Sequence, residues 1–159
     1  MTKEVSISIK GIQFIENDNG ENTLGRSDNV GSALGRSDEE AVELVTTGIY
    51  HCRDGNQYIK YDETFEGIEG KASNLLTIRG DVVEVRKTGV LETHMVFDKR
   101  KKTASIYKTP YGALHMNIMT TNLTTSENQD NIDIQVKYTL EANEETLSKN
   151  VLEIHITSN

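Results

Sequence analysis

Apolar residues alternate with polar residues along most of this chain, and this period of two limits the fold more than any other feature. The clearest case is the segment 132–140, IDIQVKYTL, in which every second residue is apolar or aromatic. Shorter runs of the same kind occupy segments 5–9, 59–61, 76–78, 83–85, 91–97, 114–118 and 152–156. Because successive side chains of a strand point to opposite faces, these runs predict β-strands with one buried face. At 37–45 the β-branched Thr46 and Thr47 that follow favour a strand, and a short helical turn is the alternative.

The connections between these runs are short, which favours antiparallel pairing. Turn-forming residues such as Asp54-Gly55, Gly80-Asp81 and Thr88-Gly89 separate neighbouring runs by a few positions, and parallel strands need a much longer crossover. We therefore predict an all-β protein, an antiparallel up-and-down barrel of about 8–10 strands that is closed or nearly closed, since closure removes exposed edges. A sandwich of two sheets is the alternative. Gly11, where the alternation changes register, predicts a bulge or a bend.

The segment 16–40 departs from the alternation and carries much of the negative charge. It holds seven acidic and two basic residues, which is −5 of the formal net charge of −8, and the pentapeptide Leu-Gly-Arg-Ser-Asp occurs in it twice. Its few apolar side chains offset little of the entropy lost on ordering. We predict a single domain over 1–159 with a flexible acidic insertion at 16–40; a lid or an interaction arm is the other interpretation.

Composition and motifs argue against several classes of protein. The chain lacks the basic face of a nucleic-acid-binding protein, an apolar run long enough for a membrane helix, and a signal peptide, so we predict no nucleic-acid or membrane partner and a cytoplasmic location. The single cysteine, Cys52, precludes an internal disulfide and fits a reducing compartment. The histidines lack tight metal-ligand spacing, so we predict no metal and no cofactor. Without a phosphate loop, a nucleophile motif or a carboxylate pair, an enzyme is the least supported class.

Four phrases of the sequence resemble a known family. They are TTGIYHCRDGNQYIKYDET, VVEVRKTG, HMVFDKRKKTASIYKTPYGAL and IDIQVKYTLEAN. Together they resemble the YwiB-like family of uncharacterised bacterial proteins, over a stretch from Glu4 to the C-terminus that leaves out the acidic insertion. The resemblance implies a calycin-like (lipocalin-like) antiparallel barrel and brings no reaction with it, since fold alone does not specify function.

The candidate site residues are polar side chains that flank the apolar faces. They are Tyr58, Tyr61, Glu63, Arg86, Tyr107, Thr109, Tyr111 and Tyr138. An arginine and several phenols at one mouth of the barrel could bind a carboxylate or phosphate through the planar guanidinium group. In the alternative interpretation Arg86 pairs with Glu63 or Glu84, and the tyrosines cap the barrel with their hydroxyl groups in water.

Two functions follow from these alternatives. In the first, the barrel binds a small, partly apolar ligand, because small barrels lie near the limit between a filled interior and one that holds a guest. In the second, the core is packed and the barrel acts through a protein partner or through self-association, for example as a homodimer. An open interior, and an Arg86 side chain that points into it, would favour the first.

Overall fold

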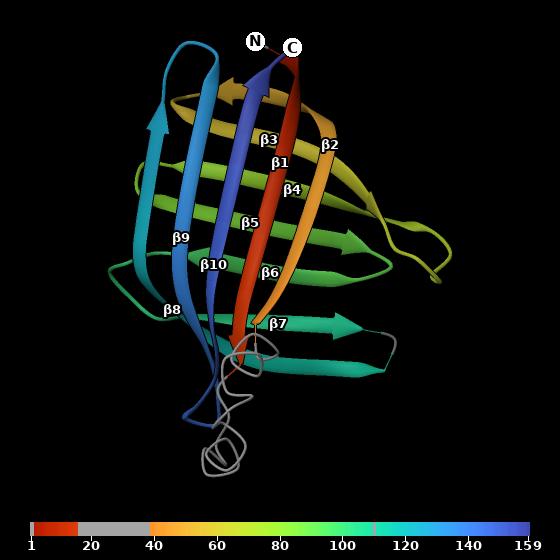
Figure 1. Cartoon of the computed structure of the whole chain (residues 1–159), viewed down its shortest axis with the longest axis vertical. Coiled ribbons are helices and arrows are strands. Elements are labelled where there is room, and N and C mark those ends of the chain that lie inside the picture. Colours follow the sequence, from red (N-terminus) through yellow and green to blue (C-terminus); the bar gives the residue numbers. More distant parts are fainter. Residues whose placement is uncertain (1, 16–38, 110) are drawn as a thin grey trace, which may run out of the picture.

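A computed structural model describes residues 2–15, 39–109 and 111–159 of the chain, and the elements within these ranges are strands (Figure 1). Their bounds are β1 Thr2–Ile15, β2 Glu39–Arg53, β3 Asn56–Thr64, β4 Lys71–Arg79, β5 Val82–Gly89, β6 Glu92–Phe97, β7 Thr103–Thr109, β8 Gly112–Glu127, β9 Asn131–Ala142 and β10 Glu145–Ser158. The all-β prediction is confirmed. No helix in the described part of the chain is long and apolar enough to cross a membrane.

The strands form one closed antiparallel barrel with up-and-down topology. Each strand pairs with its neighbours along the chain, and β1 pairs with β10 to close the ring. The predicted closed barrel is therefore confirmed, and the alternative of two separate sheets is wrong. Closure satisfies the backbone donors and acceptors that an open sheet would expose at its two edges.

The barrel is flattened into two layers that cross at a steep angle. In Figure 1, β9, β10 and β1 run lengthwise in front, whereas β3 to β7 run across behind them. Two long strands belong to both layers. β2 pairs with β1 over 39–51 and with β3 over 49–53, and β8 pairs with β7 over 112–118 and with β9 over 117–127. This is the arrangement in which strands turn the corners between orthogonally packed sheets.

Each corner strand has a local feature near the point where it changes partners. In β2 this is Gly48, where an added Cβ would lie 2.4 Å from the Lys60 carbonyl oxygen and 2.7 Å from Ile7 Cδ1. In β8 the register shifts between Thr120 and Asn122, as expected for a bulge that bends a strand. No bulge forms at Gly11, because β1 keeps its register with both neighbours through that position, and that part of the prediction is wrong.

The predicted turns at Asp54-Gly55 and Gly80-Asp81 are found, whereas Thr88 and Gly89 belong to β5 and the link to β6 follows at 90–91. Asp54 and Gly55 join β2 to β3 with φ angles of 51° and 83°, the positive values that a tight hairpin turn requires. The helical turn proposed over 37–45 is wrong from Glu39 onward, since β2 begins there. For the same reason Glu39 and Glu40 belong to a strand and not to the acidic insertion. The rest of that insertion, 16–38, lies outside the described residues.

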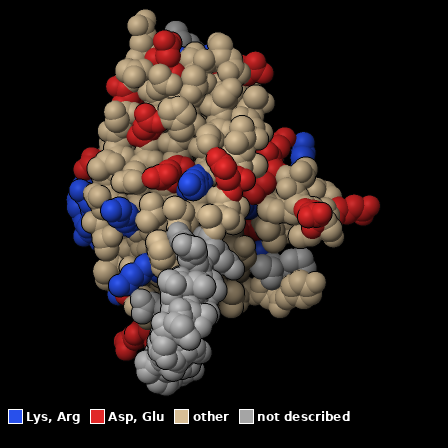
Figure 2. All heavy atoms as spheres, viewed as in Figure 1, with Lys and Arg blue, Asp and Glu red and all other residues tan. Residues whose placement is uncertain are grey.

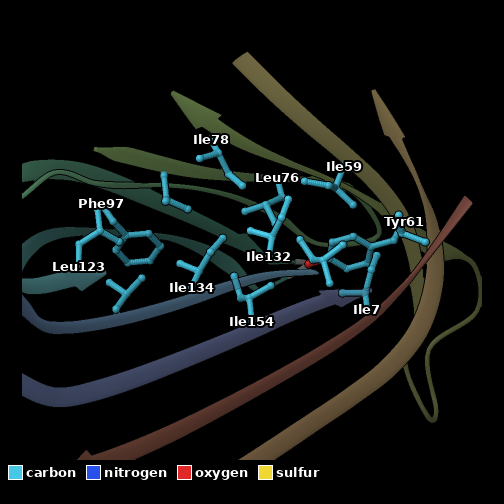
Figure 3. Close-up of a cluster of buried hydrophobic side chains, with 14 of the residues drawn as sticks. Ile7, Ile59, Tyr61, Leu76, Ile78, Phe97, Leu123, Ile132, Ile134 and Ile154 are labelled. Atoms are coloured by element: carbon cyan, nitrogen blue, oxygen red, sulfur yellow. The ribbon is translucent and has the colours of Figure 1, made fainter. Parts of the chain in front are cut away.

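The apolar face of each strand turns inward and fills much of the barrel (Figure 3). The buried cluster consists of Val5, Ile7, Ile59, Tyr61, Leu76, Ile78, Val83, Phe97, Ile118, Leu123, Ile132, Ile134, Val136, Ile154 and Ile156. The alternation read from 132–140 is confirmed there: three of its residues are in the cluster, while Tyr138 and Leu140 are partly buried and pack against it. These last two lie toward the end of the barrel where the core gives way to a cavity.

Candidate functional site

A pocket of about 270 Å³ lies at the end of the barrel where β1 ends and β2 begins. Seven strands contribute to its wall. The lining residues are Gly11, Ile12, Gln13, Val42, Met95, Ser105, Tyr107, Met116, Tyr138, Leu140, Asn150 and Val151. None of these side chains carries a charge, and the wall combines apolar groups with hydroxyl and amide groups. Such a wall suits a small neutral molecule with an apolar body, since a buried charge would need a partner.

Two of the predicted site residues, Tyr107 and Tyr138, line this pocket. Tyr107 is 36% exposed and lies at the rim. Tyr138 lies deeper, with its ring centroid 4.8 Å from that of Phe97, and burial raises the pKa of its phenol to about 12. Ser105 is fixed by a hydrogen bond of 2.9 Å from its hydroxyl to the His94 carbonyl oxygen. The wall is therefore held on one side by the buried core and on the other by the contact between β6 and β7.

Tyr61 and Glu63 also face the interior, but they belong to a different cluster. Lys87 Nζ lies 2.9 Å from Glu63 Oε1, both side chains are about one-fifth exposed, and Asn74 Nδ2 donates to the same carboxylate oxygen at 3.3 Å. Tyr61 is 8% exposed, and burial together with the nearby Glu63 charge raises the pKa of its phenol. Glu63 thus has an ion-pair partner inside the barrel, and this partner is Lys87 and not Arg86.

We expect Glu63→Gln to lower the free energy of unfolding by about 2 kcal/mol, because it leaves the largely buried Lys87 ammonium without its counter-charge. The neighbouring Asp62 provides the control, since it pairs with Lys71 at 3.1 Å on the exposed outer face. Asp62→Asn should have a much smaller effect. Urea denaturation of the two variants measures the difference. Equal decreases in the free energy of unfolding would show that the interior ion pair contributes no more to stability than the exposed one.

Arg86 lies on the outer face and not in the pocket. It is paired across the sheet with Leu75 and His94, on the face opposite to the one that Val85 turns to the core. Its guanidinium lies 3.9 Å from Glu84 Oε2, and His94 contacts the same carboxylate. The alternative prediction that Arg86 pairs with Glu84 is confirmed. The structure does not bring Arg86 together with the phenols of the pocket.

The remaining candidates are also dispersed. Tyr58 is paired across the sheet with His51 and Thr77 on the outer face. Tyr111 is 98% exposed. Thr109 is the last residue of β7, and its side chain lies outside the described part of the structure. One shared site for all eight predicted residues is therefore not formed.

A second hollow, of about 390 Å³, lies on the outside of the barrel over β1, β2, β8, β9 and β10. Several charged side chains line it, and two polar pairs already join neighbours there: His155 with Asp133, and Gln135 Nε2 with Glu153 at 3.1 Å. Figure 2 shows acidic and basic side chains interspersed over this side of the molecule. Across the described residues, no group of three or more His, Cys, Asp or Glu side chains could hold a metal ion. We therefore take the pocket at the barrel end as the candidate site.

Most of the pocket wall was not anticipated from the sequence. Gln13 and Asn150 are polar residues at inward positions of β1 and β10, and they face each other in the pairing of these strands. The signal for them was available, because each continues the parity of buried residues in its own strand: Val5 and Ile7 in β1, and Ile154 in β10. A polar residue at an inward position of an otherwise apolar strand face indicates either the end of the packed core or a position that contacts a ligand.

Comparison with known proteins identifies the family of the chain. Residues 30–154 match the family described as Domain of unknown function (DUF1934). The chain belongs to this family. The match takes in β2 to β9 and most of β10, and thus most of the strands that build the pocket.

A relative and a solved structure resemble the chain. The uncharacterised β-barrel protein YwiB of Bacillus subtilis is 22% identical over 107 residues, which are 67% of this chain and 74% of YwiB. The crystal structure of the YwiB protein superposes with a TM-score of 0.75 at 17% identity, covering 99% of this chain and 93% of that one. The resemblance to YwiB-like proteins is confirmed, and the two proteins share the barrel fold.

Proposed function

We propose that this DUF1934 barrel binds a small, neutral, partly apolar ligand in the pocket at the barrel end. The observation that carries the proposal is the wall of the pocket, which has a volume of about 270 Å³ and no charged side chain. Sites for drug-sized molecules begin at about 300 Å³ and are mostly apolar with a few polar groups. The ligand is therefore expected to be smaller than a typical drug molecule.

The rim of the pocket supports entry from solvent. Val42 and Leu114 turn toward the interior side of β2 and β8 and yet are 69% and 60% exposed, with the Tyr107 ring beside Leu114 in the strand pairing. Apolar side chains exposed around a concave site are typical of ligand entrances. The up-and-down order of the strands supports a calycin-like (lipocalin-like) binding barrel, and the single cysteine supports a cytoplasmic location.

We expect the neutral fluorescent probe N-phenyl-1-naphthylamine to bind the wild-type protein with enhanced emission, and Met116→Trp to weaken this binding at least about tenfold by filling the pocket. Met119→Trp is the matched control, because Met119 lies on the same strand but faces outward and is 39% exposed. Fluorescence titration gives the affinities. The chain contains no natural tryptophan, so each variant also reports the polarity around its own new side chain.

Failure of the probe and of other neutral aromatic probes to bind the wild type would contradict the proposal.

The second candidate function, a packed barrel that acts by association, is favoured by Val45 and Ile49, which are 71% and 46% exposed on the outer face of β2. Light scattering at increasing concentration tests it: a dimer that dissociates in Val45→Lys would support self-association, and a monomer throughout would exclude it.

A further inference from the structure

A row of polar side chains crosses four neighbouring strands on the inner face of the barrel at the pocket. Gln13 of β1 faces Asn150 of β10, Asn150 faces Tyr138 of β9, and Tyr138 faces Thr120 of β8. Directly paired residues share a face of the sheet, with neighbouring Cβ atoms about 5 Å apart. Three of the four, Gln13, Asn150 and Tyr138, line the pocket, whereas Thr120 extends the row by one strand and is not a lining residue. These four residues form the polar row.

Two members of the polar row are buried and the other two, Gln13 and Tyr138, are partly buried. Asn150 is 7% exposed and Thr120 is 6% exposed. Asn150 Nδ2 donates to Ser148 Oγ at 3.1 Å, which fixes the plane of the amide. The hydroxyl oxygen of Thr120 is buried and has no hydrogen-bond partner. A buried polar group without a partner destabilises the folded protein, so each such group calls for an explanation.

The chemistry of the polar row restricts what it can bind. Its members are two carboxamides and two hydroxyl groups, so the row offers both donors and acceptors and no charge. A ligand carboxylate or ammonium would be left without a counter-charge against this wall, which is strongly unfavourable. A hydrocarbon would leave the polar atoms unpaired. A group that is neutral, planar, and both donates and accepts satisfies the row, and a carboxamide has these properties.

Resting on the proposed function, we infer that the polar row recognises the carboxamide group of a small ligand whose apolar body lies against Met95, Met116 and Leu140. The Tyr138 ring is positioned for this by its contact with Phe97. Burial is also the cause of the raised pKa of Tyr138, about 12, so its phenol remains a neutral donor throughout the physiological range. The other three side chains of the row do not titrate, so the row presents uncharged hydrogen-bonding groups at neutral pH.

The test compares three probes of the same shape: naphthalene-2-carboxamide, its hydrocarbon analogue 2-isopropenylnaphthalene, and naphthalene-2-carboxylate. Calorimetric or fluorescence titration of the full chain should give an affinity for the carboxamide at least about tenfold above that for either analogue, the difference expected for one or two hydrogen bonds to buried groups. Tyr138→Phe and Asn150→Leu should each weaken carboxamide binding about three- to tenfold and leave hydrocarbon binding within about twofold. Tyr58→Phe, which removes a phenol from the outer face, should change neither.

Gln13→Met keeps the inference testable if a larger change prevents folding. It removes the carboxamide of a partly buried wall residue at similar side-chain size, so the free protein should stay about as stable as the wild type, while carboxamide binding weakens about threefold. Equal affinities for carboxamide and hydrocarbon, or tighter binding of the carboxylate, would overturn the inference and leave the proposed function standing. Absence of binding by all three probes and by N-phenyl-1-naphthylamine would instead reject the proposed function itself.

Discussion

Phe97→Ala is expected to lower the free energy of unfolding by about 3–5 kcal/mol, the range for aromatic residues deleted from a packed core. Phe97 is 0% exposed, is the largest of the fully buried side chains, and packs against the Tyr138 ring in a tilted arrangement. Its removal leaves a void at the boundary between the packed core and the pocket. The same variant should therefore also weaken probe binding, because the Tyr138 ring loses its support.

Phe14→Ala is the matched control for this measurement. Phe14 is on the outer face near the end of β1 and is 43% exposed, so its removal should cost less than about 1 kcal/mol. Urea denaturation at constant slope measures both variants. Losses of similar size would show that the inner face of the barrel is not the main source of its stability.

Gly48→Ala is expected to destabilise the barrel by about 2–3 kcal/mol, although alanine is ordinarily the better residue in a strand. The new Cβ would lie 2.4 Å from a backbone oxygen and 2.7 Å from a buried isoleucine methyl group, and the backbone atom in particular cannot move without shifting β3. Gly48 is where β2 leaves the front layer for the back one, so the corner must open to admit even a methyl group.

Gly11→Ala separates this steric effect from the general effect of replacing glycine. An added Cβ at Gly11 meets nothing within 4 Å, so the substitution should be neutral or stabilise the protein slightly by restricting the unfolded chain. Thermal unfolding of the two variants, compared with the wild type, gives the contrast. If the Gly48→Ala variant were as stable as the Gly11→Ala variant, the bend of β2 between the two layers would not require a residue without a side chain.

The fold could be predicted because its cause is local. The alternation of apolar and polar residues predicts the buried face of a strand, as in 132–140. Residues that favour positive φ angles predict a hairpin turn, as at Asp54-Gly55. The outward position of Arg86 could also have been predicted from the sequence. Val83 and Val85 on the same strand are apolar and indicate the inner face, and Arg86 has the opposite parity. Side-chain parity along a single strand therefore carries more information about a candidate site than the type of residue alone.

The pocket could not be predicted because it depends on the register between strands. Gln13, Asn150 and Tyr138 are distant in sequence, and they form a row only because three neighbouring strands are aligned in one particular way. A shift of one residue in any pairing would turn a side chain to the other face. The bulge of β8 after Thr120 also depends on register, since it is defined only by the pairing of β8 with β9.

The pairing of β1 with β10 has a consequence for how the protein is made. It joins parts of the chain as far apart as Ser6 and Asn159, which are 153 positions apart and hydrogen-bonded through their side chains. During translation β1 is synthesised before the other strands, and eight more strands, β2 to β9, are synthesised before its second pairing partner, β10. Until β10 is available, one edge of β1 lacks the partner that it has in the barrel, and unpaired strand edges of this kind favour aggregation during folding.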